Sequence, residues 1–181
     1  MNQVNPKRIK AIRSRLKMDF EYYAARCLKV LAKPDANGKR GIIPFKLNPA
    51  QKYIHKRIEE QKAKLGYVRA MILKGRQQGA STYTEGRFYW KTTQNVGEKT
   101  YILTHSAEAT DNLFGMVDRY HKNAPVHVRP YVGKDNAKEL VFDNLDSRYQ
   151  VATAGSKGAG RSATLTNVHG SEVGFWDKLY L

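Results

Sequence analysis

YVRAMILKGRQQGAST, residues 67–82, joins a short apolar run to a glycine-rich turn. The run at 67–73 has the length and composition of a buried strand. The turn at 74–80 leads into a helical stretch that we expect from about Ser81 to Thr93. The sequence therefore predicts strand, loop and helix, in that order, at the centre of the fold.

The pattern continues on the C-terminal side of this stretch. A second strand is expected at Lys99–Thr104 and a second helix from Ala107 to about Lys122. Beyond them, 140–142 and 149–152 are typical of a hairpin, and a further strand is expected from 163 to about 168. Strands that alternate with helices predict an α/β fold with an open, mostly parallel sheet flanked by helices.

The N-terminal side begins with an amphipathic stretch from Ile9 to about Leu31. Apolar residues recur every three or four positions, and the opposite face is basic, so we expect one helix that stops near Pro34. Its basic face suits phosphate contacts or a lipid surface, or is simply solvated. Residues 34–41 carry turn chemistry typical of a linker or a hairpin loop. We therefore divide the chain into an N-terminal basic segment, 1–41, and a second unit, 42–181.

Another helix is expected from Ala50 to about Lys64. Asn48 stands at its capping position, Pro49 at its first helical position and Gly66 after its end. These signals are local in the sequence.

Composition restricts the class of partner. The chain has 181 residues, with 32 Lys and Arg against 16 Asp and Glu, for a net charge of +16. Such a balance favours a polyanion, with nucleic acid ahead of a ribosomal or membrane surface. The single cysteine, Cys27, excludes an internal disulfide framework and is expected in the core. No run approaches the roughly 18 apolar residues of a membrane span, and no secretory signal is seen, so a cytoplasmic protein without a membrane partner is expected.

The glycine-rich turn has the properties of a phosphate-binding loop. Between a strand and a helix, such a turn presents backbone N–H groups and the positive helix end to phosphates. Gly79 would allow close approach of the backbone, and the Ser81 hydroxyl is placed to bind Mg²⁺. The usual spacing, G-x-x-x-x-G-K-[ST], fails at Lys74 and Ala80, so Lys74 and Arg76 must supply the positive charge. The alternative is an ordinary glycine-rich surface turn.

A second candidate lies near the C-terminus. Glu172 follows an expected strand, where a carboxylate in an open α/β sheet can polarise a water for attack on a γ-phosphate. The alternative is a solvated loop acid. His169, three positions earlier, is expected to be a packing residue because no other His or Cys clusters with it.

Two further residues are weaker candidates. Arg161 lies in a glycine-rich loop, 155–162, that suits either DNA phosphates or the γ-phosphate of a neighbouring subunit. The alternative is a mobile surface loop. Gln51 lies at a helix start, where its amide could pair with the edge of adenine or could simply face solvent.

Taken in order along residues 45–176, these motifs resemble the N-terminal ATPase domain of a phage terminase large subunit, the DNA-packaging motor. The most specific parts are the phosphate loop with its lysine displaced upstream and the stretch SEVGFW at 171–176. The resemblance implies a P-loop NTPase fold of the ASCE type, with ATP and Mg²⁺ bound. The nucleotide-binding residues that it implies are Gln51, Lys74, Gly75, Arg76, Gln77, Gln78, Gly79, Ala80, Ser81 and Thr82.

The resemblance also implies roles. Gln51 would read adenine, Ser81 would bind Mg²⁺, Glu172 would activate the attacking water, and Arg161 would act in trans as an arginine finger. The implied partners are double-stranded DNA, the portal protein, the small terminase subunit and further copies of the chain, in the bacterial host cytoplasm.

The sequence departs from the family pattern in two places. Ser171 stands where the family has an aspartate before the catalytic glutamate. Leu181 is the last residue, nine positions after Glu172, so the coupling motif, the remaining strands and the nuclease domain are missing, and we expect a fragment or a truncated reading frame. Two alternatives remain: a non-catalytic basic nucleic-acid-binding module and a helicase-like DNA-dependent ATPase.

Overall fold

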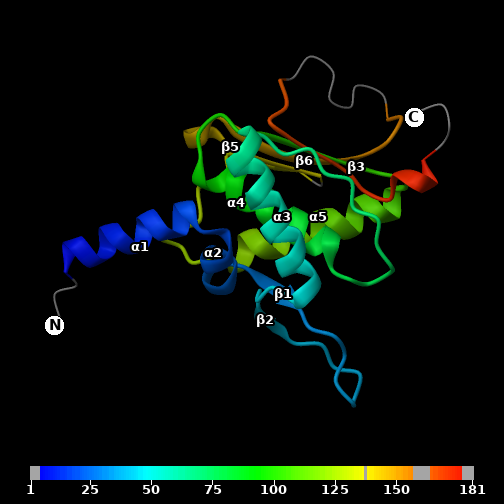
Figure 1. The fold of residues 1–181 in the computed structure, drawn as a ribbon, viewed down its shortest axis with the longest axis horizontal. Coiled ribbons are helices and arrows are strands. Elements are labelled where there is room, and N and C mark those ends of the chain that lie inside the picture. The colour runs from blue at the N-terminus through cyan, green and yellow to red at the C-terminus, as the bar shows by residue number, and fades with distance from the viewer. Residues whose placement is uncertain (1–4, 137, 157–163, 177–181) are drawn as a thin grey trace.

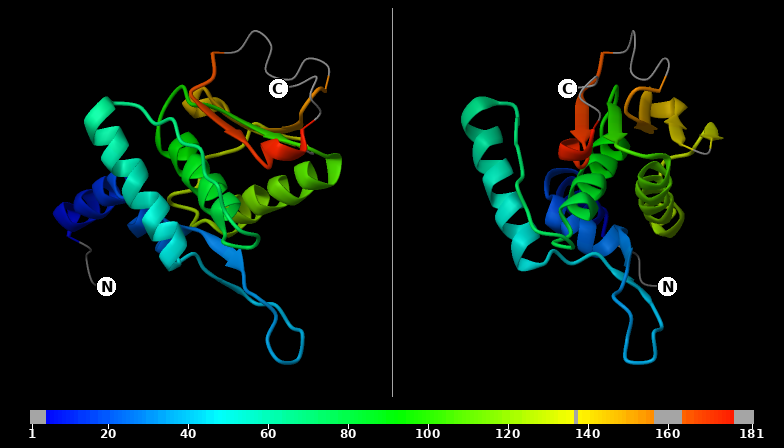
Figure 2. Two further views of the ribbon diagram at one scale, coloured as in Figure 1. Left: turned by 45° about the vertical axis from the view of Figure 1, so that its right-hand side comes forward. Right: turned by 90° about the vertical axis from the view of Figure 1, so that its right-hand side faces the viewer.

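The computed structural model describes residues 5–136, 138–156 and 164–176. Within them the chain adopts an α/β fold, with helices packed against a mixed sheet (Figure 1). A small two-stranded hairpin extends from this body (Figure 2). In the described part of the chain no helix is long and apolar enough to cross a membrane. The expected α/β class is confirmed.

The main sheet has five strands in the order β4-β5-β6-β3-β7. Its parallel part consists of β3 (Lys99–Thr104), β6 (Ser147–Thr153) and β7 (Asn167–Gly170), with β3 in the middle. β5 (Glu139–Phe142) and β4 (Lys134–Asn136) add an antiparallel edge. The expected hairpin is therefore confirmed as β5 and β6. β4 was not expected, and the sheet is mixed because β5 runs antiparallel to β6.

Two helices cover one face of this sheet. α4 (Ala80–Gln94) and α5 (Ala107–Asn123) match the expected helices and lie on the same side of the strands (Figure 2). Thr92 of α4 bonds Thr100 of β3 at 2.7 Å. Thr110 of α5 bonds Thr153 of β6 at 2.9 Å. These two hydrogen bonds hold α4 against β3 and α5 against β6.

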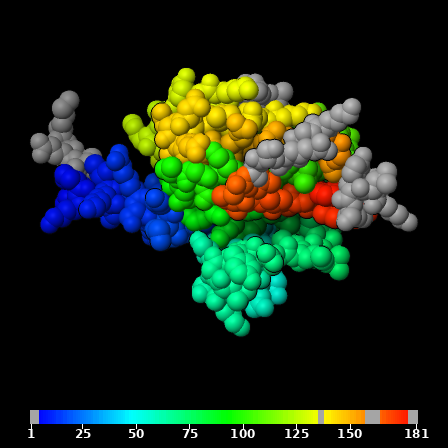
Figure 3. Space-filling model, turned by 90° about the horizontal axis from the view of Figure 1, so that it is seen from above, coloured from blue at the N-terminus to red at the C-terminus, as the bar shows by residue number. Residues whose placement is uncertain are grey.

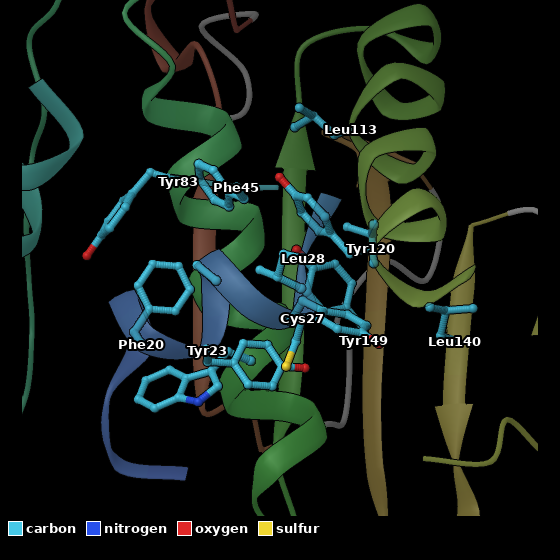
Figure 4. Packing of buried hydrophobic residues seen from close by; sticks show 14 of the residues in the cluster. Phe20, Tyr23, Cys27, Leu28, Phe45, Tyr83, Leu113, Tyr120, Leu140 and Tyr149 are labelled. Atoms are coloured by element: carbon cyan, nitrogen blue, oxygen red, sulfur yellow. The ribbon is translucent and has the colours of Figure 1, made fainter. Parts of the chain in front are cut away.

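The core lies between the sheet and the helices and is rich in tyrosine (Figure 4). Fully buried members include Tyr23, Tyr83, Tyr89, Tyr120 and Tyr149. Each of their hydroxyls has a hydrogen-bond partner, as buried polar groups require. Burial raises the pKa of Tyr83 to about 12. These side chains combine large apolar surfaces with satisfied polar ends.

The N-terminal region differs from the single expected helix. The structure has α1 (Pro6–Met18) and α2 (Phe20–Cys27), separated by Asp19. The Asp19 carboxylate accepts a hydrogen bond from the backbone N–H of Tyr22 at 2.8 Å, so it caps α2 and ends the continuous helix. Cys27 is buried as expected.

The residues after α2 form the small hairpin. β1 (Lys29–Leu31) pairs antiparallel with β2 (Ile42–Pro44), and the expected turn at 34–41 is the loop between them. Phe20 and Leu28 pack in the same hydrophobic core as the rest of the fold. The N-terminal segment is thus part of one packed body.

α3 (Pro49–Leu65) has the expected boundaries. Asn48 caps it by accepting from the backbone N–H of Gln51 at 2.9 Å, and Pro49 is its first residue. Gly66 ends it with φ 78°, a left-handed conformation that glycine adopts without strain.

The expected strand at 67–73 is wrong. This segment lies outside the sheet, and Met71 and Leu73 are 99% and 101% exposed. The side chain of Gln61 in α3 takes the place of a neighbouring strand, because it accepts from the Arg69 N–H at 2.6 Å and donates to the Arg69 carbonyl at 3.0 Å. The glycine-rich turn therefore connects α3 to α4 without a strand of its own.

Candidate nucleotide and carboxylate site

The glycine-rich turn ends in a left-handed bend at the start of α4. Gly79 has φ 77° and forms the N-cap of α4 without a side-chain capping bond. Gln77 has φ 59°, which is unusual for a residue with a side chain. Backbone strain of this kind is often found at ligand-binding sites. Because Gly79 has no side chain that could accept a hydrogen bond, the first N–H groups of α4 receive no bond from the N-cap residue.

Three side chains near this bend are available for a ligand. Lys74 and Arg76 are exposed and have no ion pair or hydrogen bond among the residues that the structure describes. Ser81 lies in the first turn of α4, is half-buried, and its hydroxyl makes no hydrogen bond within the same described residues. The bend thus combines backbone donors, two cations and a hydroxyl.

α4 runs antiparallel to the parallel strands. Its last turn meets the start of β3, where Thr92 bonds Thr100 at 2.7 Å. Its middle meets β7 further along, where the Glu85 carboxylate lies 2.8 Å from Nδ1 of His169. The N-terminus of α4 consequently points to the edge of the sheet where β3 and β7 end.

Glu172 lies in a tight turn at this same edge. Its φ is 54°, again a left-handed conformation for a residue with a side chain. The backbone N–H of Ser171 donates to the carbonyl of Leu103 at 2.8 Å, which extends the pairing of β7 with β3. The indole N–H of Trp176 donates to the carbonyl of Ser171 at 3.1 Å. These bonds fix the turn, while the Glu172 side chain stays 48% exposed.

His105 is an ionisable partner of Glu172 among the residues that the structure describes. It follows β3 directly, and its Nδ1 lies 3.4 Å from a carboxylate oxygen of Glu172. Its ring also packs on Phe175, with the ring centroids 5.8 Å apart. No role for His105 was expected from the sequence. The signal that could have identified it is its position at the end of a strand parallel to the one that carries Glu172.

A buried polar cluster lies beneath this edge. Glu85 is fully buried and accepts a hydrogen bond from the Tyr149 hydroxyl, and its other oxygen contacts His169. Burial and the nearby Glu85 carboxylate raise the pKa of Tyr149 well above its usual value. His169 is thus a packing residue with a specific polar partner. Glu85 itself carried no sequence signal.

Gln51 lies next to the glycine-rich turn, but its side chain is buried. Its side chain is only 4% exposed and lies between the first turn of α3 and Gly79. Arg161, the expected arginine finger, lies outside the described residues. Within those residues no group of three or more His, Cys, Asp or Glu side chains is arranged to hold a metal ion.

No model of a known protein family matches this chain, and a search among curated proteins finds no match either. The geometry and the sequence motifs are therefore the basis for the functional argument.

Proposed function

We propose that this chain is the ATP-hydrolysing domain of a phage terminase large subunit, with a P-loop NTPase site at the start of α4. One observation carries the proposal. The uncapped N-terminus of α4 and the carboxylate of Glu172 lie toward the same edge of the sheet, although Gly79 and Glu172 are 93 positions apart in the sequence. In open α/β sheets, ligands bind at this edge.

The phosphates of ATP would be held by the glycine-rich turn. Backbone N–H groups at a helix N-terminus and the helix dipole favour an anion. Lys74 and Arg76 have no partner in the described part of the chain, so they are available to neutralise phosphate charge. This arrangement provides positioning and electrostatic stabilisation, the main sources of catalysis in phosphoryl transfer.

At this site the protein would supply one ligand to Mg²⁺. Mg²⁺ prefers oxygen ligands and commonly keeps several waters beside substrate phosphates. The Ser81 hydroxyl, without a bond of its own in the described residues, is such a ligand. When bound with ATP, the ion supplies charge neutralisation at the phosphate oxygens. Ser171, which stands where the family has an aspartate, is buried and is held in the turn by its backbone.

Glu172 would act as the general base for the attacking water. Its carboxylate is exposed enough to reach a water, and its backbone is fixed by the turn between β7 and Trp176. His105 would orient this carboxylate from the neighbouring strand. A general base must be held within hydrogen-bonding reach of the proton that it takes.

The wider role that we propose comes from the resemblance. The domain would couple hydrolysis to the movement of double-stranded DNA into a capsid, in the bacterial host cytoplasm. It would act with the portal protein, the small terminase subunit and further copies of the chain, one of which would supply Arg161 in trans.

Thermal unfolding with and without Mg-ATP tests nucleotide binding by the unaltered chain. At about 100 times its Kd, a ligand adds about 2.7 kcal/mol to the free energy of unfolding. We expect Mg-ATP to raise the melting temperature of the natural sequence and to raise that of Arg76→Ala much less, because a phosphate contact is lost.

The control is Arg40→Ala, which removes the same charge from the exposed hairpin loop. Its response to Mg-ATP should equal that of the natural sequence. If Mg-ATP leaves all three proteins unchanged, the chain has no nucleotide site at α4.

A second candidate function, a basic nucleic-acid-binding module, is favoured by α1. Four cations recur along this helix at intervals of three or four residues: Lys7, Lys10, Arg13 and Lys17. All are exposed and have no ion pair among the described residues. The helix projects from the body (Figure 3). Because these residues share one side of a helix, they suit a phosphate backbone.

Salt-dependent DNA binding tests this surface. Replacing all four cations by Gln should lower the slope of log K against log salt by about 3.6, since each phosphate contact on duplex DNA contributes about 0.9. The matched control replaces Lys39, Arg40, Lys62 and Lys64, which are exposed elsewhere. Equal slopes for the two quadruple variants would contradict a specific role for α1.

A further inference from the structure

We propose that Gln51 anchors the glycine-rich turn to α3 and so positions the phosphate-binding backbone, rather than reading the nucleotide base. The proposal rests on the nucleotide site proposed above. It also differs from the adenine-reading role that the family resemblance implies for this residue.

Both ends of the Gln51 amide are bonded inside the protein. Oε1 accepts from the backbone N–H of Asn48 at 2.9 Å, and Nε2 donates to the carbonyl of Gly79 at 2.8 Å. An N–H can only donate and a carbonyl can only accept, so these two partners fix the orientation of the amide. With 4% of the residue exposed, little of the side chain is presented to a ligand.

The glycine at position 79 makes this contact close. A Cβ added there would lie 2.7 Å from Nε2 of Gln51, closer than a real Cβ approaches another atom. Asn48 makes a second hydrogen bond to the turn, because its Nδ2 donates to the Gln78 carbonyl at 3.3 Å. Two consecutive carbonyls of the turn are therefore bonded to the first turn of α3.

α3 is itself attached to α4, which makes it a suitable support. The Arg87 guanidinium of α4, only 6% exposed, forms an ion pair with Glu59 of α3 at 2.6 Å. His55 of α3 bonds the hydroxyl of Tyr83 in α4 at 3.0 Å. The hydrogen bond from Gln51 to Gly79 thus attaches the glycine-rich turn to α3, and α3 is itself bonded to α4 through Glu59 and His55.

This arrangement predicts which interactions depend on Gln51. The carbonyls of residues 78 and 79 point to α3, which leaves the N–H groups of the following turn directed away from these bonds. Loss of the anchor should weaken the binding of phosphates. It should not change the preference for ATP over GTP, because both ends of the Gln51 amide are bonded to backbone groups.

Gln51→Glu is the most informative variant. Glutamate keeps the oxygen that accepts from Asn48 and favours the third position of a helix, so the cap of α3 is retained. It loses the N–H that donates to Gly79. Gln51→Ala removes both bonds. The matched control is Gln61→Ala, because Gln61 lies on the same helix and bonds the backbone of Arg69 through both ends of its amide.

The affinities to measure are those for Mg-ATP, Mg-GTP and Mg-tripolyphosphate, which has no base. We expect Gln51→Glu to weaken binding of all three by a similar factor, about 2- to 12-fold, the size of one hydrogen bond. The ratio of the ATP and GTP affinities should stay as in the natural sequence, and Gln61→Ala should change none of the three. A collapse of that ratio with unchanged tripolyphosphate affinity would overturn the proposal in favour of base reading.

Amide hydrogen exchange gives a readout that needs no nucleotide. Exchange of the Tyr83 N–H, which donates to the same Gly79 carbonyl at 3.0 Å, should be faster in Gln51→Glu than in the natural sequence, and unchanged in Gln61→Ala. If the natural chain binds none of the three ligands, the proposed function fails, while faster exchange still supports the anchor. Unchanged exchange in Gln51→Glu would overturn the anchor itself.

Discussion

We expect Glu172→Gln to lower the kcat of the proposed ATP hydrolysis by about 10²- to 10⁴-fold, the usual contribution of a general base, and to leave Mg-ATP binding close to that of the natural sequence. The amide keeps the size of the carboxylate and can still accept a hydrogen bond from His105, which lies 3.4 Å from Glu172. It cannot take a proton from water. Steady-state hydrolysis and equilibrium binding, measured on the same preparations, check both parts.

The control for this variant is Glu108→Gln. Glu108 is an exposed acid in the first turn of α5, which begins just after β3, and it loses the same charge. Its kcat should remain within about twofold of the natural value, as expected for a surface carboxylate. Equal rates in Glu172→Gln and the natural sequence would contradict the assignment of the base.

The variant His105→Asn distinguishes the role of His105 from that of Glu172. If His105 only orients Glu172, this variant should retain more activity than Glu172→Gln. Loss of hydrolysis in His105→Asn with activity preserved in Glu172→Gln would instead make the imidazole the base.

The second large effect concerns stability. His169→Ala should lower the free energy of unfolding by about 1–3 kcal/mol, the cost of leaving a buried acceptor without one of its hydrogen-bond partners. It leaves the fully buried Glu85 carboxylate with the Tyr149 hydroxyl as its remaining hydrogen-bond partner in the described residues. Denaturant unfolding followed by Trp fluorescence measures the loss.

Two comparisons identify the cause. His127→Ala removes an exposed imidazole and should cost no more than about 0.5 kcal/mol. Adding Glu85→Gln to His169→Ala should recover part of the loss, because a neutral amide replaces the buried carboxyl group that has lost its partner. A cost for His169→Ala equal to that for His127→Ala would show that the pair does not stabilise the fold.

Local signals explain what the sequence predicted well. The bounds of α3 follow from Asn48 and Gly66, whose conformations depend on a few neighbouring residues. The expected hairpin of β5 and β6 and the helices α4 and α5 likewise follow from short patterns. Asp19 carried a capping signal of the same kind, but the continuous apolar stripe around it favoured one helix over two.

Tertiary contacts explain what the sequence did not predict. The run 67–73 has strand composition, but its backbone is bonded by the Gln61 side chain, and β7 rather than this run pairs with β3. In the site, Glu172 could be selected from its position after a strand. His105 also follows an expected strand, but its contact with Glu172 depends on β3 and β7 being neighbours, which the sequence alone does not show.

A crystal structure of the chain with Mg²⁺ and a non-hydrolysable ATP analogue tests the central claim most directly. We predict that the triphosphate lies on the backbone N–H groups at the start of α4, with Lys74 and Arg76 on its oxygens and Glu172 one water from the γ-phosphate. An analogue bound elsewhere on the chain, or Glu172 directed away from a triphosphate bound at α4, would contradict the account.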